Sequence, residues 1–385
     1  MIDNELLVQL QQLQKKLLEI VKNIPASDHT RQFHPELSPP GWHLGHCVFT
    51  ESYWLRDVVM AMEKTDDELK QLYIPELSIK TTRSSALPAH KDLCSWAENI
   101  QNENIEYLSE LIEAESDAEL MQDDYLIFFL CQHYAQHIET ISYVLAQRNL
   151  QIDSDFKVDS ALTAKSLHKD FRQVDKGEFF IGANDPLRHY DNECPRFSVS
   201  LDAFQIANTA VSNAEFLGFI EAEAYQNNEY WDANAWQWCE QNNIGCPQHW
   251  RLDKAGNYYG TDASGPYELE ADKAVTGLSL YEAKAVASWA RARLPHEYEW
   301  EVAKKAGLLA KTDQAWEWCY NDFHPYKDFK AFPYEGYSLP WFDLQHFTLR
   351  GSSEYTQSII SRDTFRNFYQ ADKRHFPAGL RLAAA

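Results

Sequence analysis

Apolar residues in the first part of the chain recur at intervals of three and four, the spacing that places them on one side of an α-helix. This pattern predicts helices over about residues 4–24, 40–59, 87–113 and 118–147. In the first helix the apolar side comprises Leu6, Leu7, Leu10, Leu13, Leu17, Ile20 and Val21. Four long amphipathic helices in succession predict an antiparallel four-helix bundle over residues 1–152.

The pattern changes after this bundle. Residues 153–170 are polar and are predicted to form a linker. Short alternating runs follow, such as 197–207, and they are separated by turns rich in Gly, Asn, Asp and Pro. We expect one clear helix over 280–292 and a shorter one over 297–306. The pattern therefore predicts a second, α+β domain over residues 171–385.

Composition and charge limit the classes of partner. A chain of 385 residues favours two domains, and 44% apolar residues indicate a folded core. With 35 Lys and Arg against 58 Asp and Glu, the net charge is −23. This charge repels nucleic-acid phosphates and anionic membranes, and no basic patch in the sequence offsets it. We therefore expect neither nucleic acid nor a membrane as a partner.

The sequence carries no sign of export or membrane insertion. No stretch reaches the roughly 18 consecutive apolar residues of a transmembrane helix, and the N-terminus lacks the pattern of a secretory signal. The seven cysteines form no repeated CxxC pair, so we expect free thiols in a reducing compartment. These observations predict a cytoplasmic protein.

His133 and His137 are candidate metal ligands in the fourth predicted helix. Residues four apart lie one above the other on a helix face, so both imidazoles can reach one metal ion. Glu139 stands about 200° round the helix from His137. It is expected to face solvent or another helix, or to anchor a ligand imidazole.

The second predicted helix adds two more histidines, His43 and His46. One of them can complete a three-imidazole site if both helices face the core of the bundle. Three neutral nitrogen ligands with open positions suit Fe(II), Zn or Cu. The two side chains diverge by about 60°, so only one is needed, and spacing does not choose between them.

These histidine motifs resemble the DinB-like domain of the ergothioneine-type sulfoxide synthases. In that family the last histidine of the helix-two motif and both histidines of HxxxHxE hold iron. The resemblance implies that His46, His133 and His137 are the ligands. The position of His43 is usually acidic in the family, which is a departure in this chain.

The second half resembles a formylglycine-generating-enzyme-type domain, which has a C-type-lectin-like fold. The matching stretches are residues 275–283, 293–301, 316–318, 349–353 and 378–383. The order of the two domains agrees with that of the sulfoxide synthases. The resemblance thus implies a multidomain protein in which an α domain is followed by an α+β domain.

The family resemblance implies an O2-dependent, non-haem Fe(II) enzyme. It would join the sulfur of a cysteine-type thiol to an imidazole carbon of histidine or hercynine (trimethylated histidine) and oxidise that sulfur to a sulfoxide. Three histidine ligands leave three positions on octahedral iron, enough for the imidazole nitrogen, the thiolate and O2. Holding three reactants at one centre makes their encounter intramolecular.

Several substrate contacts in the first half are implied by the same resemblance. Gln136 would contact the histidine-derived substrate. Lys80 and Arg83 lie where the family places basic residues that bind the carboxylate of the thiol, a task that suits a bidentate arginine.

Near the C-terminus, Asn367 and Arg374 match a family segment, whereas Phe368 and Tyr369 replace its Trp and Asp. Asn367 and Phe368 would frame the imidazole substrate and its ammonium group. The branch that uses γ-glutamylcysteine binds this dipeptide through that Asp and Arg. Tyr369 therefore favours free cysteine, or another small thiol or selenol, over γ-glutamylcysteine.

The family also keeps an active-site tyrosine that supplies a proton or an electron to the oxygen intermediate. The aromatic loop 325–342 offers Tyr326, Tyr334 and Tyr337 as candidates. We rank Tyr337 first among them.

Other functions stay open at this stage. A selenoneine-type or ovothiol-type synthase of the same family would use the same ligands. A DinB-type thiol S-transferase would need the three histidines and a divalent metal, but neither O2 nor iron. A third alternative is a non-catalytic, lectin-like binding module. A copper-dependent formylglycine-generating oxidase is disfavoured, because no cysteine follows Cys319.

Overall fold

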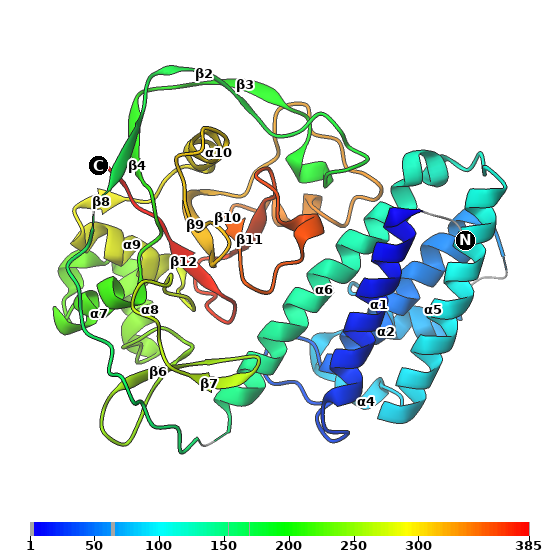
Figure 1. The fold of residues 1–385 in the computed structure, drawn as a ribbon, viewed down its shortest axis with the longest axis horizontal. Coiled ribbons are helices and arrows are strands. Elements are labelled where there is room, and N and C mark those ends of the chain that lie inside the picture. Colours follow the sequence, from blue (N-terminus) through cyan, green and yellow to red (C-terminus); the bar gives the residue numbers. More distant parts are fainter. Residues whose placement is uncertain (1–3, 63–65, 153, 169, 385) are drawn as a thin grey trace. The chain divides into compact units, whose positions relative to one another are not determined.

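The computed structural model describes residues 4–62, 66–152, 154–168 and 170–384. The predicted linker 153–170 thus includes two positions, 153 and 169, that lie outside the described residues. The chain divides into two compact units (Figure 1). The helical unit comprises residues 1–148 together with 356–360, and the mixed unit comprises 149–355 and 361–385.

Four long helices form the helical unit, as the sequence predicts. They are α1 (Glu5–Asn23), α2 (Pro40–Ser52), α5 (His90–Glu113) and α6 (Tyr125–Leu150). A π-helical stretch, Tyr53–Val59, extends α2, and the short helices α3 (Asp67–Tyr73) and α4 (Arg83–Ala86) precede α5. The side chain of Asn4 caps α1 by accepting from the backbone N–H groups of Leu6 and Leu7.

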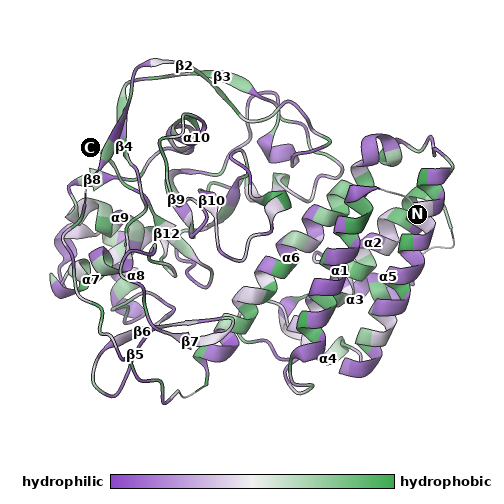
Figure 2. Cartoon of the chain, in the orientation of Figure 1, coloured by the Kyte–Doolittle hydropathy of each residue, from purple (hydrophilic) through white to green (hydrophobic). Residues whose placement is uncertain are grey.

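Helices α1 and α5 bury one apolar side in the core of this unit, whereas α2 and α6 are buried over most of their surface. Leu10, Leu17 and Val21 of the predicted stripe on α1 are fully buried. Figure 2 shows hydrophobic and hydrophilic residues on different sides of these helices. Among the described residues, no helix combines the length and the apolar character needed to span a bilayer.

One segment from late in the sequence belongs to the helical unit. Residues 356–360 follow the long strand β10 (His346–Ser352) but are grouped with the helices. The Thr356 hydroxyl donates to Oε1 of Glu139 on α6 over 2.7 Å, and Nζ of Lys16 on α1 donates to Oε1 of Gln357 over 2.8 Å. Ile360 ends the segment and is fully buried.

The mixed unit is built on several small sheets. One four-stranded sheet has the order β1-β4-β13-β8, and another has the order β11-β10-β9-β12. Strands β2 and β3 form a hairpin-like pair, and β5, β6 and β7 form a three-stranded sheet. The remaining strand bounds are β1 (Phe171–Val174), β2 (Gly177–Ile181), β3 (Phe197–Leu201), β4 (Phe204–Ala207), β5 (Trp250–Leu252), β6 (Tyr258–Asp262), β7 (Gly265–Tyr267), β8 (Ala292–Arg293), β9 (Ala315–Asp322), β11 (Asn367–Gln370), β12 (Ala378–Leu380) and β13 (Ala383–Ala384).

The expectation of one clear helix and one short helix in this unit is wrong. The structure contains α9 (Leu280–Trp289) and α10 (Glu297–Lys305) as predicted, but also α7 (Asn213–Glu221) and α8 (Ala233–Gln241). Both additional helices are only nine residues long, so each offers few repeats of the apolar spacing. A capping box in which Ser212 pairs with Glu215 marks the start of α7 and is the signal that was missed.

Buried ion pairs connect the matching sequence motifs of this unit. Arg366 donates to both carboxylate oxygens of Glu297 over 2.8 Å, and Arg381 donates to both oxygens of Glu317 over 2.7 Å. All four side chains are nearly inaccessible to solvent. Although burial alone would raise it, the charges of Arg366 and Arg350 lower the pKa of Glu297 to about 2. These motif residues therefore stabilise the fold.

Candidate metal centre

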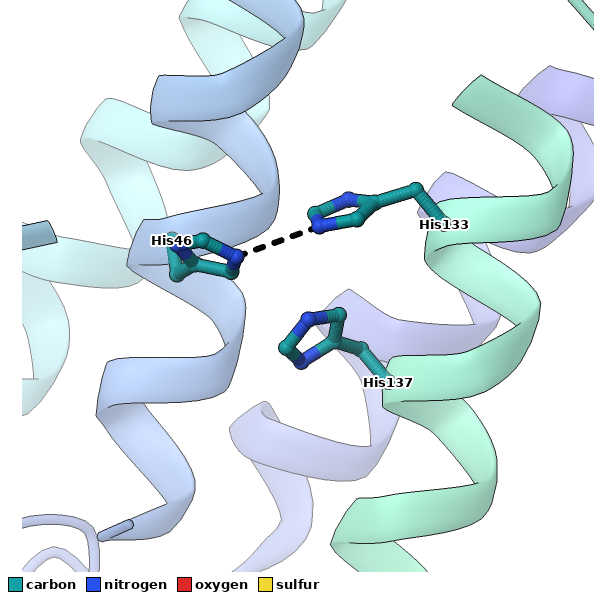
Figure 3. A group of neighbouring side chains, drawn as sticks. All are labelled: His46, His133 and His137. Carbon is teal, nitrogen blue, oxygen red and sulfur yellow. Dashed lines mark hydrogen bonds between the residues drawn. The ribbon is translucent and has the colours of Figure 1, made fainter. Parts of the chain in front are cut away.

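Helices α2 and α6 bring three histidines together. Figure 3 shows His46 on α2 facing His133 and His137 on α6. Nε2 of His46 lies 3.1 Å from Nε2 of His133. One ring nitrogen from each of the three histidines lies within 4.8 Å of the others, so that the group could hold a metal ion. Spacing left both His43 and His46 open as the member from α2, and the structure places His46 in this group.

Backbone and aromatic contacts fix the ring of His46. Its Nδ1 lies 2.7 Å from the carbonyl oxygen of Tyr73, which leaves Nε2 for a metal. The ring of Trp42 stacks on it with centroids 4.6 Å apart and planes within 8°. Gly45 lets Tyr73 approach, because a Cβ at this position would lie 2.3 Å from the tyrosine ring. The positions of Trp42, Gly45 and Tyr73 are thus part of the site.

His43 lies beside the group of three. Its Nδ1 is 2.9 Å from Nδ1 of His137, and its side chain is 3% exposed. Nε2 of His43 and Nδ1 of His133 are buried and have no hydrogen-bond partner within the described part of the chain.

The electrostatic environment keeps these imidazoles neutral. Burial, together with the charges of His46 and Arg83, lowers the pKa of His43 to about 3. Burial lowers the pKa of His46 to about 4, although its hydrogen bond to the Tyr73 carbonyl works in the opposite direction. The pKa values of His133 and His137 also lie well below the ordinary value because of burial and neighbouring histidines. At neutral pH each ring therefore has a lone pair available for a metal.

These observations fit a transition-metal ion. Nε2 of His46 on α2 and Nε2 of His133 on α6 face each other 3.1 Å apart, a separation at which both atoms could bind one ion (Figure 3). Because Nδ1 of His46 donates to the Tyr73 carbonyl, the Nε2 of this neutral ring carries a lone pair that faces His133. Three neutral nitrogen donors suit Fe(II), Zn or Cu rather than Mg or Ca.

Arg83 and Lys80 differ in their surroundings. Arg83 is buried: Nη1 donates to Oγ of Ser38 over 2.5 Å, Nη2 donates to the carbonyl of Ser78 over 2.8 Å, and the guanidinium lies 3.8 Å from the ring centre of Trp42. It also lines a cavity of about 450 Å³ formed by α3, α4 and the loop between them. Lys80 is exposed, and its Nζ donates to the carbonyl of Glu36 over 2.8 Å.

Two further candidate residues, Gln136 and Glu139, lie on α6. Gln136 is half-buried and directly precedes His137. Glu139 is buried and accepts from Thr356.

The remaining predicted substrate residues belong to the mixed unit. Asn367, Phe368 and Tyr369 lie on β11, and all three are half-buried. The ring of Phe368 stacks on Phe323 with centroids 4.2 Å apart. The ring of Tyr369 stacks on Phe376 at 3.8 Å.

Arg374 follows β11 and is tied to the core of the mixed unit. Its Nη2 lies 3.2 Å from Oε1 of the fully buried Glu282 and donates to the carbonyl of Cys246. Glu282 also accepts from the hydroxyl of Tyr225 over 2.7 Å.

The three candidate tyrosines have distinct environments. Tyr337 is half-buried, and its ring stacks on Tyr190 with centroids 4.3 Å apart. Tyr334 is 39% exposed. Tyr326 is 2% exposed, and its hydroxyl has no hydrogen-bond partner among the residues that the structure describes. Burial keeps the pKa of Tyr326 well above its ordinary value.

Sequence reasoning missed two residues that hold His46 in place. Trp42 stands directly before His43 and could have been found through that position. Tyr73 contributes a backbone carbonyl from the separate helix α3, and no pattern in the sequence points to such a contact.

Two family models match consecutive parts of the chain. The DinB superfamily matches residues 9–141, and the sulfatase-modifying factor enzyme 1-like domain matches residues 160–314. The expected pair of domains, a DinB-like helical domain and a formylglycine-generating-enzyme-like α+β domain, is therefore confirmed.

Several characterised proteins are similar over most of the chain. Hercynine oxygenase of Mycobacterium tuberculosis is 26% identical over 91% of this chain and 92% of its own length. Hercynine oxygenase of Mycolicibacterium smegmatis is 25% identical over 96% of both chains. Ergothioneine biosynthesis protein 1 of Schizosaccharomyces pombe is 26% identical over 69% of this chain and 40% of its own length.

Proposed function

Because the chain is a fusion of a DinB-like and a formylglycine-generating-enzyme-like domain of the ergothioneine sulfoxide synthase type, we propose that it is an oxygen-dependent sulfoxide synthase. It joins the imidazole of hercynine to the sulfur of a cysteine-type thiol and oxidises that sulfur. The observation that carries this proposal is the group of His46, His133 and His137 in a chain similar to hercynine oxygenases over nearly its full length. The free state of all seven cysteines supports a cytoplasmic location.

His46, His133 and His137 are the proposed ligands of Fe(II). When bound, Fe(II) supplies the redox chemistry for O2 and holds the sulfur of the thiol as a thiolate. The protein contributes three neutral imidazoles, of which His46 is oriented by the Tyr73 carbonyl and the Trp42 ring.

We propose substrate contacts for each unit separately. Gln136 is half-buried next to His137, which supports a contact with the imidazole substrate. Arg83 is proposed to bind the carboxylate of the thiol, because it lines a cavity and one N–H of its Nη1 is not engaged by Ser38. Lys80 is proposed to add a positive charge nearby. In the mixed unit, Asn367 and Phe368 are proposed to frame the imidazole substrate.

The natural thiol is proposed to be cysteine or another small thiol or selenol. The ring of Tyr369 is held by Phe376, and Arg374 is neutralised by Glu282. Neither side chain therefore offers the charge that a γ-glutamyl group would need.

Tyr337 is the proposed catalytic tyrosine. Its half-buried hydroxyl can exchange a proton with a neighbour, because Tyr190 forms a hydrogen bond with it. The fully enclosed Tyr326 and the exposed Tyr334 are less suited to this task.

The test combines anaerobic Fe(II) reconstitution with O2 uptake. Hercynine or histidine is supplied with cysteine or γ-glutamylcysteine, and the products are identified by mass. The expected product has the mass of hercynine joined to cysteine with one added oxygen. A protein that binds zinc in preference to iron and consumes no O2 with any pair would instead indicate a thiol S-transferase.

Substitutions of the proposed ligands test whether turnover depends on the histidine group. His133→Ala and His137→Ala are each expected to abolish iron binding and O2 uptake, and iron content is measured directly. His189→Ala serves as the control, because His189 is a half-buried histidine of the mixed unit whose Nδ1 contacts a backbone carbonyl, that of Asp185. Full iron occupancy in either ligand variant would refute the ligand assignment.

A further inference from the structure

A fourth histidine of α2 contacts one of the three clustered histidines. His43 is 3% exposed, and its Nδ1 lies 2.9 Å from Nδ1 of His137. The two rings have centroids 5.2 Å apart, and Trp42 packs edge-on against His43 at 5.7 Å. The imidazole of His43 is therefore held in place and directed at His137.

The hydrogen bond between these two rings has a fixed direction when a metal is present. A neutral imidazole that binds a metal through Nε2 carries its hydrogen on Nδ1, which then donates. Nδ1 of His137 faces His43, so Nε2 is the atom that His137 can offer to a metal. Nδ1 of His43 then accepts this hydrogen bond, and the hydrogen of His43 resides on its Nε2, a buried atom that has no hydrogen-bond partner among the described residues.

We propose that His43 is a positioning residue for the metal centre: it accepts the Nδ1–H of His137 and so fixes the orientation and tautomer of this ligand. The inference rests on the proposed metal site and extends it to a residue outside the three ligands. His43 offers this acceptor without adding a negative charge to the site.

The substitutions separate hydrogen bonding from packing. His43→Asn places a carboxamide oxygen close to the position of Nδ1 and keeps an acceptor. His43→Leu has a comparable size but no acceptor. His90→Leu is the matched control, because His90 lies in the same unit and hydrogen-bonds a backbone carbonyl, that of Val21.

The readout is anaerobic binding of Co(II) to the full-length, metal-free protein, measured by competition and by the visible d–d spectrum. His43→Leu is expected to weaken Co(II) binding by about 10–100-fold and to shift the spectrum, since loss of an outer-shell partner of a ligand has effects of this size. His43→Asn and His90→Leu are expected to stay within a few-fold of the wild-type affinity. Thermal unfolding without metal verifies that each variant is folded.

Each result bears on a distinct claim. Wild-type affinity and spectrum in His43→Leu would overturn the role of His43 while leaving the metal site intact. Failure of the wild-type protein to bind one Co(II) would instead overturn the metal site itself. If His43→Leu does not fold, His43→Ala takes its place, and equal affinities of His43→Ala and His43→Asn would overturn the inference.

Discussion

Trp42 connects a buried cation to a proposed metal ligand. Its ring stacks on His46 at 4.6 Å, and the guanidinium of Arg83 lies 3.8 Å from its ring centre. Arg83 is itself held by Ser38 and Ser78. A planar guanidinium satisfies these contacts together, whereas an ammonium group does not. The orientation of His46 thus depends on a side chain that does not touch it.

Replacing Arg83 by lysine is expected to destabilise the helical unit. The change removes hydrogen bonds of a buried charge, and each such bond contributes about 1.5–3 kcal/mol. We expect the free energy of unfolding to fall by about 2 kcal/mol, measured by urea denaturation. Lys80→Ala is the comparison: Lys80 forms an exposed ion pair with Glu36 at 3.7 Å, and such pairs contribute about 1 kcal/mol or less. Equal effects of the two changes would contradict this account.

The helices of the first unit share a buried polar network around Glu51. Nε2 of Gln14 on α1 donates to its carboxyl oxygens over 2.9 and 3.0 Å, and the hydroxyl of Tyr134 on α6 donates over 2.6 Å. Burial raises the pKa of Glu51 to about 7, although these hydrogen bonds and the charge of Arg56 work against the shift. One carboxyl group of α2 therefore links α1, α2 and α6.

This network predicts a pH-dependent stability. Glu51 binds its proton more tightly in the folded chain, where its pKa is about 7, than in the unfolded chain, where the ordinary value is 4.5. Its contribution is therefore fully present below about pH 4.5 and is lost as the pH rises through about 7, a change of about 3 kcal/mol. We expect Glu51→Gln to remove this dependence. Urea denaturation of both proteins between pH 5 and 8 measures the difference; parallel curves would contradict the prediction.

In the mixed unit, the ion pair of Arg381 and Glu317 joins β9 to the chain end. Trp300 of α10 also donates to Glu317 over 2.7 Å. Arg381→Met leaves a buried carboxylate without its cation and is expected to cost about 3–5 kcal/mol. The double variant Arg381→Met, Glu317→Leu removes both charges and is expected to recover part of this loss. Thermal unfolding compares the three proteins, and a double variant less stable than the single one would contradict the argument.

At the level of elements, the periodicity of apolar residues predicted the long helices, because these depend on local spacing. The long helices α1, α2, α5 and α6 repeat their apolar residues over several turns, so their approximate positions follow from the sequence. The choice between His43 and His46 did not follow. The choice between the two histidines depends on how α2 is rotated about its own axis relative to α6. The packing of Tyr73 on Gly45 is one of the long-range contacts of α2. The contact between the Tyr73 carbonyl and His46 is another long-range contact of this kind.

The division of the whole chain into units does not follow its linear order. The helical unit includes residues 356–360, and Thr356 donates to the buried Glu139, two positions after His137. Thr356→Val removes this donor and is expected to lower the stability of the helical unit by about 1–2 kcal/mol. Thr356→Ser keeps the hydroxyl and should restore most of it. Calorimetry measures both; a valine variant as stable as the serine variant would show that the bond contributes nothing.

Because residues 356–360 belong to the helical unit, that unit cannot be completed during synthesis until this later segment has been made. Residues 149–355 of the mixed unit are synthesised before residues 356–360. The four helices therefore leave the ribosome well before the segment that is grouped with them. A product cut after residue 148 would therefore lack residues 356–360 and the hydrogen bond that Thr356 donates to Glu139, so the helical unit is not encoded by one continuous stretch.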